Sequence, residues 1–187
     1  IFTMSISFQV AEEGLTHQFK MPEAPPPDAL KDEDEILAEQ AQYWSEVPQE
    51  NHITTSAIQI RHAQPADFVN RSPLPPKQLC WMKTRERLPD NQRLHQCVLA
   101  YLSDWSLLDT AIRPHGISAL TDNLQMASLD HAMWFHRPFR ADEWLLYEQD
   151  SPVAGGARGF NRGLIYNQAG ELVASTTQEG LIRVPAG

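Results

Sequence analysis

Apolar and polar residues alternate along several stretches of the chain, the period of a β-strand with one buried face. At the start, apolar residues at the even positions from 2 to 8 are separated by Thr and Ser. Two turn signals lie near the end: Gln168-Ala169-Gly170 predicts a tight hairpin, and Gly155-Gly156 predicts a loop or bulge. Strands are therefore predicted at residues 2–8, 56–62, 78–85, 127–136, 144–150, 158–167 and 172–184.

A helical period interrupts these strands. Apolar residues step by three and four from Leu94 to Ile112, which predicts one long helix with a continuous apolar stripe. A second, short helix is expected over residues 36–43. A helix this apolar needs cover on several sides, and antiparallel strands before and after it can supply that cover. The pattern predicts an α+β fold in which an antiparallel sheet wraps around one long central helix, the hotdog arrangement.

Proline-rich sequence marks the boundary between the predicted linker and the predicted hotdog domain. Residues 21–34 contain four prolines and five acidic residues, so 21–52 is expected to be a surface linker with the short helix inside it. Residues 53–187 then form the hotdog domain. A strand that begins at residue 1, without an initiator Met, predicts that the chain is cut from a longer protein.

The composition of the chain argues against several classes of protein. The chain has 187 residues, of which 42% are hydrophobic and 21% charged, as expected for a soluble globular protein. No apolar run approaches the roughly 18 residues that span a membrane. The formal net charge of −9 argues against broad nucleic-acid binding. Two cysteines suit free thiols in a reducing cytoplasm better than a disulfide framework or metal site.

Two polar residues in apolar surroundings are candidates for chemistry. Asp104 borders the apolar stripe of the predicted helix, where partial desolvation would raise its pKa and make it a better base. The alternative is an exposed helix Asp, or one held by an Arg. Gln178 lies on the apolar face of the last predicted strand, where a buried amide needs partners. It could equally form a structural hydrogen bond.

Polar residues also occupy both faces of the strand predicted at 127–136. Ser128 and Asp130 share one face with His136, and His131 lies on the other. Asp130 with either histidine could be an acid–base pair, or all could be satisfied polar groups. The chain has no Gly-x-Ser-x-Gly elbow and no metal-ligand spacing, so water activation fits it better than a covalent nucleophile.

Three segments carry a family resemblance that extends over essentially the whole chain. His95–Asp104 is similar to the central helix of the type II (TesB-type) acyl-CoA thioesterases, and residues 178–183 with Ala157-Arg158-Gly159 resemble its closing strands. The most specific string is Asp-His-x-Met-Trp-Phe-His-Arg-Pro within 128–139, continuing to 144–147. The family's protomer is a double hotdog. Residues 1–10 resemble the last strand of its first unit, so 1–20 is expected to be that remnant and the rest of the first unit to be absent.

The resemblance implies hydrolysis of fatty acyl-CoA to fatty acid and CoA, without a cofactor. The family's Asp, Thr or Ser, and Gln that hold the attacking water match Asp104, Ser128 and Gln178. Asp130, His131 and His136 then take supporting roles. Four arginines could meet the CoA phosphates: Arg85, Arg137, Arg158 and Arg183.

The resemblance also implies partners, and alternatives remain. The chain is expected to form a homo-oligomer or to pair with the missing N-terminal hotdog, and to be weakly active or inactive alone. One alternative is a hotdog enoyl-CoA hydratase or dehydratase that pairs Asp130 with His136. Another is a non-catalytic acyl-CoA-binding or assembly fragment.

Overall fold

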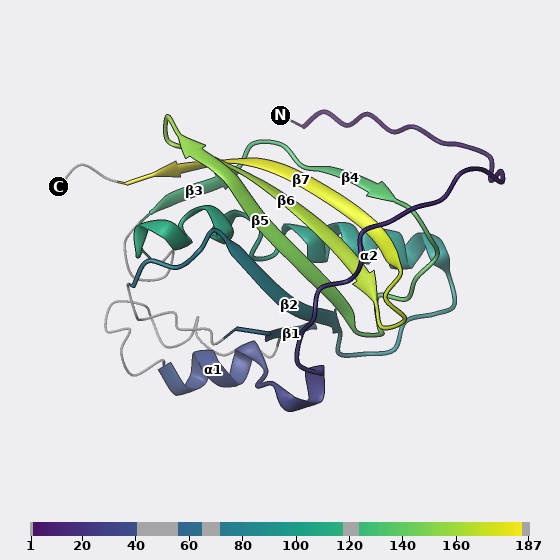
Figure 1. Ribbon diagram of the computed structural model, residues 1–187, viewed down its shortest axis with the longest axis horizontal. Helices are drawn as coiled ribbons and strands as arrows, with labels where there is room; N and C mark the ends of the chain where they lie inside the picture. Colours follow the sequence, from purple (N-terminus) through teal and green to yellow (C-terminus); the bar gives the residue numbers. More distant parts are fainter. Residues whose placement is uncertain (1, 41–55, 65–71, 118–123, 185–187) are drawn as a thin grey trace.

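The computed structural model describes residues 2–40, 56–64, 72–117 and 124–184 of the chain. In this part of the chain a seven-stranded antiparallel sheet curves around helix α2, as the hydrophobic pattern predicts (Figure 1). The strand order is β1-β2-β5-β6-β7-β3, and β4 also pairs with β7. The elements are α1 (Glu33–Gln40), β1 (Ile58–His62), β2 (Lys77–Thr84), α2 (Gln92–Asp104), β3 (Gln125–Ser128), β4 (Ala132–Phe135), β5 (Leu145–Gly155), β6 (Arg158–Asn167) and β7 (Leu172–Arg183).

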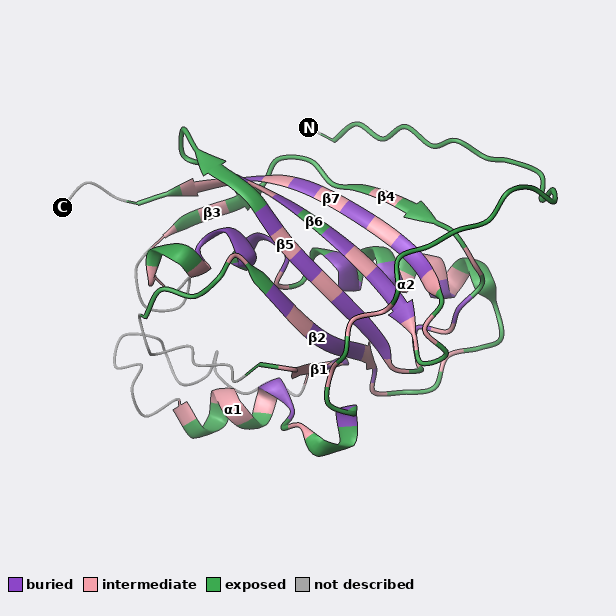
Figure 2. Cartoon of the chain, viewed as in Figure 1, coloured by how far each residue is buried: buried purple, intermediate pink, exposed green. Residues whose placement is uncertain are grey.

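The core lies between α2 and the concave face of the sheet. Leu99 and Leu102 of α2 are fully buried against Tyr147 of β5 and Ile165 of β6. Figure 2 shows the result as alternating buried and partly exposed positions along β5, β6 and β7. Gly163 has no side chain because the Tyr147 ring occupies the space that a Cβ would need. The molecule is therefore an α+β hotdog fold.

Helix α2 is shorter than predicted. Asn91 caps its first turn, accepting hydrogen bonds from the backbone N–H groups of Arg93 (3.1 Å) and Leu94 (3.4 Å). The helix ends at Asp104, and two 3₁₀ turns follow at Leu108–Ala111 and Arg113–His115. The prediction of one helix to residue 112 is wrong because Ser106 takes a left-handed conformation, with φ 62°. The apolar spacing continues across this break because the first 3₁₀ turn and Ile112 after it also face the core.

A buried polar network holds that break in place. Gln78 of β2 donates to the carbonyl of Ser106 (2.9 Å) and to Thr110 Oγ1 (2.9 Å). Gln149 of β5 exchanges hydrogen bonds with the Ser106 hydroxyl and accepts from Thr110 (3.1 Å). These partners come from two strands distant in sequence, so local periodicity could not reveal where α2 ends.

The N-terminal residues do not form the predicted strand. Residues 2–20 pair with no strand in the described chain, and their apolar side chains are exposed, as Figure 2 shows. Gln18 ties the end of this segment to the β6–β7 turn, donating to the Gly170 carbonyl (2.8 Å) and accepting from the Leu172 N–H (3.1 Å). An alternating strand needs a neighbouring strand for its backbone hydrogen bonds, and the described chain offers residues 2–8 none.

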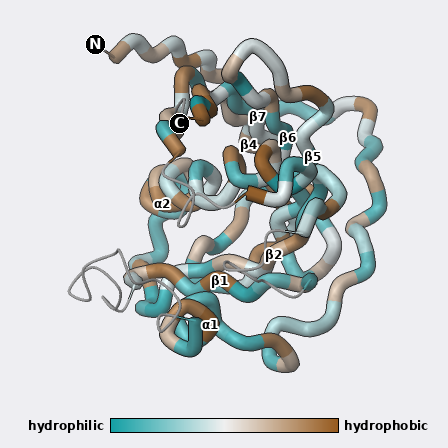
Figure 3. The backbone as a smooth tube through the Cα atoms, turned by 90° about the vertical axis from the view of Figure 1, so that its left-hand side faces the viewer, coloured by the Kyte–Doolittle hydropathy of each residue, from teal (hydrophilic) through white to brown (hydrophobic). Residues whose placement is uncertain are grey.

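The proline-rich segment lies against the outer face of the sheet. Trp81 of β2 donates its indole N–H to the Pro25 carbonyl (2.9 Å), and Met21 and Leu30 pack on the cluster that Trp81 forms with neighbouring strands. Helix α1 covers residues 36–40 of the short helix predicted at 36–43, and residues 41–43 of that prediction lie outside the described part. In Figure 3, β1 and β2 lie between α1 and α2. No helix in the described residues is long and apolar enough to cross a membrane.

Candidate active site

The three predicted site residues come together where α2 ends above β7. Ser128 Oγ donates to Asp104 Oδ1 at 3.0 Å. The side-chain nitrogen of Gln178 donates to the same carboxylate oxygen and lies 3.0 Å from Ser128 Oγ. The three side chains therefore form one closed hydrogen-bonded group, drawn from α2, β3 and β7.

Two glycines allow the chain after α2 to approach the sheet closely enough for this contact. A Cβ at Gly180 of β7 would overlap the Leu108 side chain, and one at Gly159 of β6 would lie 2.5 Å from Ala111 Cβ. Any larger residue would push the 3₁₀ turn, and the end of α2 before it, away from β7. Gln178 lies two residues before Gly180 on the same face of β7 and is fully buried.

A bulge between β3 and β4 decides which side chains reach this group. Ser128 pairs with Gly180 and Ala132 pairs with Thr177, so four steps along one chain match three along β7. The N–H groups of both Leu129 and Asp130 donate to the Glu179 carbonyl, at 2.9 and 3.3 Å. Two residues opposite one are the mark of a β-bulge. The prediction of a single strand over 127–136 is therefore wrong.

The bulge also reverses the alternation of faces. An uninterrupted strand would place Ser128 and His131 on opposite faces, because they are three residues apart. In the structure both point to Gln178: His131 Nδ1 lies 3.3 Å from its side-chain nitrogen. The other ring nitrogen of His131 lies 2.9 Å from Ser103 Oγ on α2. Asp130 closes the bulge by accepting from the Glu179 N–H at 2.8 Å.

His131 is thus a site residue that sequence reasoning gave only a supporting role. The polar residues on both faces of Ser-Leu-Asp-His were the signal of a bulge, since a regular strand has one polar face. Loss of hydration against α2 lowers the pKa of His131, while the carboxylates of Asp104 and Asp130 act in the opposite direction.

Asp104 is more exposed to solvent than the sequence predicted. The sequence predicted a partly desolvated carboxylate, but Asp104 is exposed at the end of α2. Both Ser128 and Gln178 donate to its Oδ1, so Oδ2 is the oxygen left to accept a proton. Gln178 is the buried member of the group, and its Oε1 has no hydrogen-bond partner among the described residues.

The structure does not bring Asp130 and His136 together. Asp130 lies opposite Glu179 and His136 opposite Val173, six residues apart along β7, which corresponds to roughly 20 Å. The His136 ring instead bonds Ser175 Oγ at 2.8 Å. The Asp130–His136 pair suggested for a dehydratase is therefore not formed.

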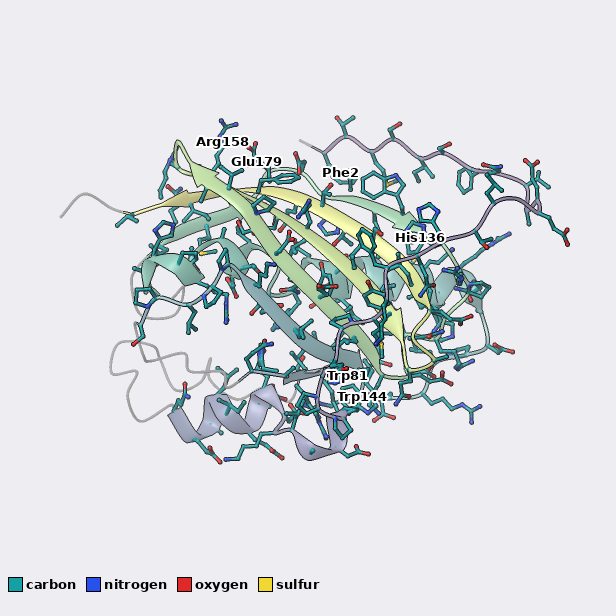
Figure 4. All side chains as sticks on the ribbon, viewed as in Figure 1. Phe2, Trp81, His136, Trp144, Arg158 and Glu179 are labelled. Atoms are coloured by element: carbon teal, nitrogen blue, oxygen red, sulfur yellow. The ribbon has the colours of Figure 1, made fainter. Side chains whose placement is uncertain are left out.

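The four candidate arginines are scattered. Arg85 is bound to Asp32 (3.0 Å) and Asp34 (2.6 Å), which removes the free charge expected of it. Arg158 is exposed and pairs with Glu179 (3.1 Å) beside the β5–β6 hairpin, as Figure 4 shows. Arg137 bonds the Leu172 carbonyl, and Arg183 bonds Gln125.

The described residues supply neither a metal-ligand cluster nor a disulfide at this site. Within the described ranges, no group of His, Cys, Asp and Glu side chains could hold a metal ion. Both cysteines are free thiols: Cys80 is buried and Cys97 exposed. The chemistry on offer is therefore that of a carboxylate, a hydroxyl, an amide and an imidazole.

Comparison with known proteins identifies the family of this chain. The family model described as acyl-CoA thioesterase matches residues 54–181. Acyl-CoA thioesterase 2 of Haemophilus influenzae is 38% identical over 180 residues, covering 96% of this chain and 63% of the relative. Human acyl-coenzyme A thioesterase 8 is 38% identical over 195 residues, covering 98% and 60%. The chain thus spans about three fifths of the length of these relatives.

Comparison with solved structures supports the same family and fold. The acyl-CoA thioesterase II TesB2 of Mycobacterium marinum is 44% identical, with a TM-score of 0.72, covering 96% of this chain and 61% of that one. A protein with a hot dog fold from Alicyclobacillus acidocaldarius, at 16% identity and a TM-score of 0.66, supports the fold alone. The chain belongs to the acyl-CoA thioesterase family.

Proposed function

We propose that the protein hydrolyses fatty acyl-CoA thioesters to free fatty acid and CoA, using a water molecule activated by Asp104. The observation that carries this proposal is the closed group of Asp104, Ser128 and Gln178 at the end of α2. Among the described residues, Asp104 Oδ2 accepts no hydrogen bond, and two groups fix the position of the carboxylate through Oδ1. The relatives, which are named as acyl-CoA thioesterases, supply the substrate class.

The chemistry follows from this arrangement. Asp104 Oδ2 takes a proton from water as the water oxygen attacks the thioester carbonyl carbon. The tetrahedral intermediate then expels the CoA thiolate, which recovers the proton from the Asp104 carboxyl. Ser128 and Gln178 hold the carboxylate directly, whereas the resemblance implied that they hold the water. The reaction needs only water and a base, so we propose no cofactor.

We propose further that a second hotdog unit completes the site. Three observations support this: Asp104 is exposed, the apolar side chains of residues 2–10 lie open, and the relatives are longer than this chain. Contiguous apolar surface of this kind marks an interface. An N-terminal hotdog unit or another copy would cover it and enclose the acyl chain. We place the protein in the reducing cytoplasm because it carries two free thiols, and in fatty acid metabolism because its relatives are named as acyl-CoA thioesterases.

The test is thiol release from a medium-chain and a long-chain acyl-CoA. It compares the chain alone with the chain joined to a preceding hotdog unit, and uses Asp104→Asn of the joined protein as the inactive control. We expect hydrolysis by the joined protein and little or none by the chain alone. If neither protein hydrolyses either substrate, thioester hydrolysis at this site is excluded. Turnover by a monomeric chain alone, at the rate of the joined protein, would refute the need for a second unit.

A further inference from the structure

The site requires the Gln178 amide to point its nitrogen, and not its oxygen, at Asp104. An oxygen there would oppose the carboxylate. The same nitrogen also faces His131 Nδ1, at 3.3 Å. Which end of the amide suits that position depends on whether Nδ1 carries a proton.

Ser103 determines where the proton of His131 resides. Its hydroxyl donates to the Ala100 carbonyl at 2.9 Å, and its other neighbour, Met133 Sδ at 4.0 Å, is a weak acceptor. Ser103 has a single proton to donate and is fully buried, so its oxygen is left to accept from His131 Nε2 at 2.9 Å. The ring is therefore the Nε2–H tautomer, and Nδ1 presents a lone pair to the Gln178 amide.

We infer that His131 is a positioning residue: its neutral Nε2–H tautomer keeps the nitrogen of Gln178 turned toward Asp104 and Ser128, and protonation of His131 disrupts this arrangement. A proton on Nδ1 would face the amide N–H₂ group, donor against donor. Rotating the amide would relieve that conflict but would turn its oxygen against Asp104. The two demands on Gln178 are compatible only while His131 is neutral. This role deepens the proposed function, on which its kinetic consequence rests.

The surroundings of His131 set the pH range over which it positions the Gln178 amide. Two carboxylates face the ring, Asp104 from α2 and Asp130 from its own segment, and from β7 it meets the uncharged Gln178. Loss of hydration outweighs the carboxylates and lowers the pKa of His131 below its usual value of about 6.5. A lowered pKa means that the neutral form persists at neutral pH. His131 therefore positions Gln178 at neutral and alkaline pH, and this role is lost only in acid, as the pH falls through the lowered pKa of His131.

Two substitutions of His131 separate the roles of its two ring nitrogens. His131→Asn places an amide oxygen near the Nδ1 position, so it keeps the acceptor for Gln178. His131→Gln reaches only the Nε2 position, so it keeps the donor to Ser103 and loses that acceptor. We expect kcat at pH 8 within about threefold of wild type for His131→Asn, and a loss of roughly 10- to 100-fold for His131→Gln, with KM little changed.

Ser103→Ala tests the tautomer itself. It removes the acceptor at Nε2 and frees His131 to take the Nδ1–H form, so we expect a kcat loss like that of His131→Gln. His131→Asn should also move the acid limb of the pH–rate profile to lower pH, because its side chain takes up no proton. Equal losses in His131→Asn and His131→Gln, or an acid limb that stays at the wild-type pH in both, would reduce His131 to a packing role and overturn the inference.

A measurement on the ¹⁵N-labelled chain decides the matter without any turnover. Long-range proton–nitrogen correlation spectra report the tautomer of His131, and the Gln178 side-chain amide is assigned by comparison with Gln178→Ala. We expect the Nε2–H pattern at pH 8, and Gln178 amide shifts that move together with the His131 titration. An Nδ1–H tautomer, or a Gln178 amide indifferent to that titration, would refute the inference. A wild type without hydrolase activity would instead refute the proposed function and leave this spectrum as the test.

Discussion

Asp104→Asn separates the catalytic role of the carboxylate from its structural one. Asn has nearly the same shape, and its side-chain oxygen can still accept from Ser128 and Gln178. What it loses is Oδ2, the oxygen left free to take a proton in the proposed reaction. Asp130→Asn is the matched control: it removes the same charge from an exposed carboxylate near His131, and its oxygen can still accept from the Glu179 N–H.

Asp104→Asn should have a large effect on the reaction rate and a small effect on stability. Loss of a general base costs about 10² to 10⁴ in rate, or roughly 3 to 5 kcal/mol of transition-state stabilisation. The structural cost is that two hydrogen bonds to a charged oxygen become bonds to a neutral one. That change is worth about 1 kcal/mol in an exposed position. Asp104→Asn should therefore fold normally and fail in catalysis.

The assay is thiol release from a medium-chain acyl-CoA at pH 8 by the chain joined to an N-terminal hotdog unit, with the free energy of unfolding measured in parallel. We expect Asp104→Asn to lose 10² to 10⁴ in kcat and Asp130→Asn to stay within about threefold of wild type. Activity of Asp104→Asn within threefold of wild type would remove it from the role of base. An equal loss in both variants would show that only the local charge matters.

Three further predictions concern the fold. A thiol reagent should modify only Cys97 in the native chain, and both cysteines after denaturation, because burial raises the pKa of Cys80 to about 12. Asp142→Asn should lower the unfolding free energy by about 1–2 kcal/mol at pH 7. A hydrogen-bonded guanidinium and a backbone N–H hold the pKa of Asp142 at about 2, so in denaturant titrations this difference should vanish as the pH falls from about 4 to 2. Gly163→Ala should cost about 1–3 kcal/mol in the same titrations through overlap with a buried tyrosine ring. Gly155→Ala, whose Cβ would meet open space, should change the unfolding free energy by less than about 0.5 kcal/mol.

The periodicity of the sequence determined the architecture. Alternation located β1, β2, β5, β6 and β7, and the step of three and four located α2, because both periods report a buried face that each element must have. The Gly-containing turn before β7 was also predictable, since Gly170 takes a φ of 81° that few other residues adopt. The residue types of the site, Asp104 on the helix and Gln178 on the apolar face of a strand, were visible for the same reason.

Only the tertiary structure decided how those residues meet. The end of α2 depends on hydrogen bonds from Gln78 and Gln149, which lie on strands distant in sequence. The bulge that turns Ser128 and His131 to the same side depends on the pairing of two N–H groups with the Glu179 carbonyl. A strand prediction for residues 2–8 fails for a related reason, because alternation cannot supply the partner that a strand requires. Sequence periodicity records which face of an element is buried, whereas register, helix ends and ring orientation are set by contacts between segments far apart in the chain.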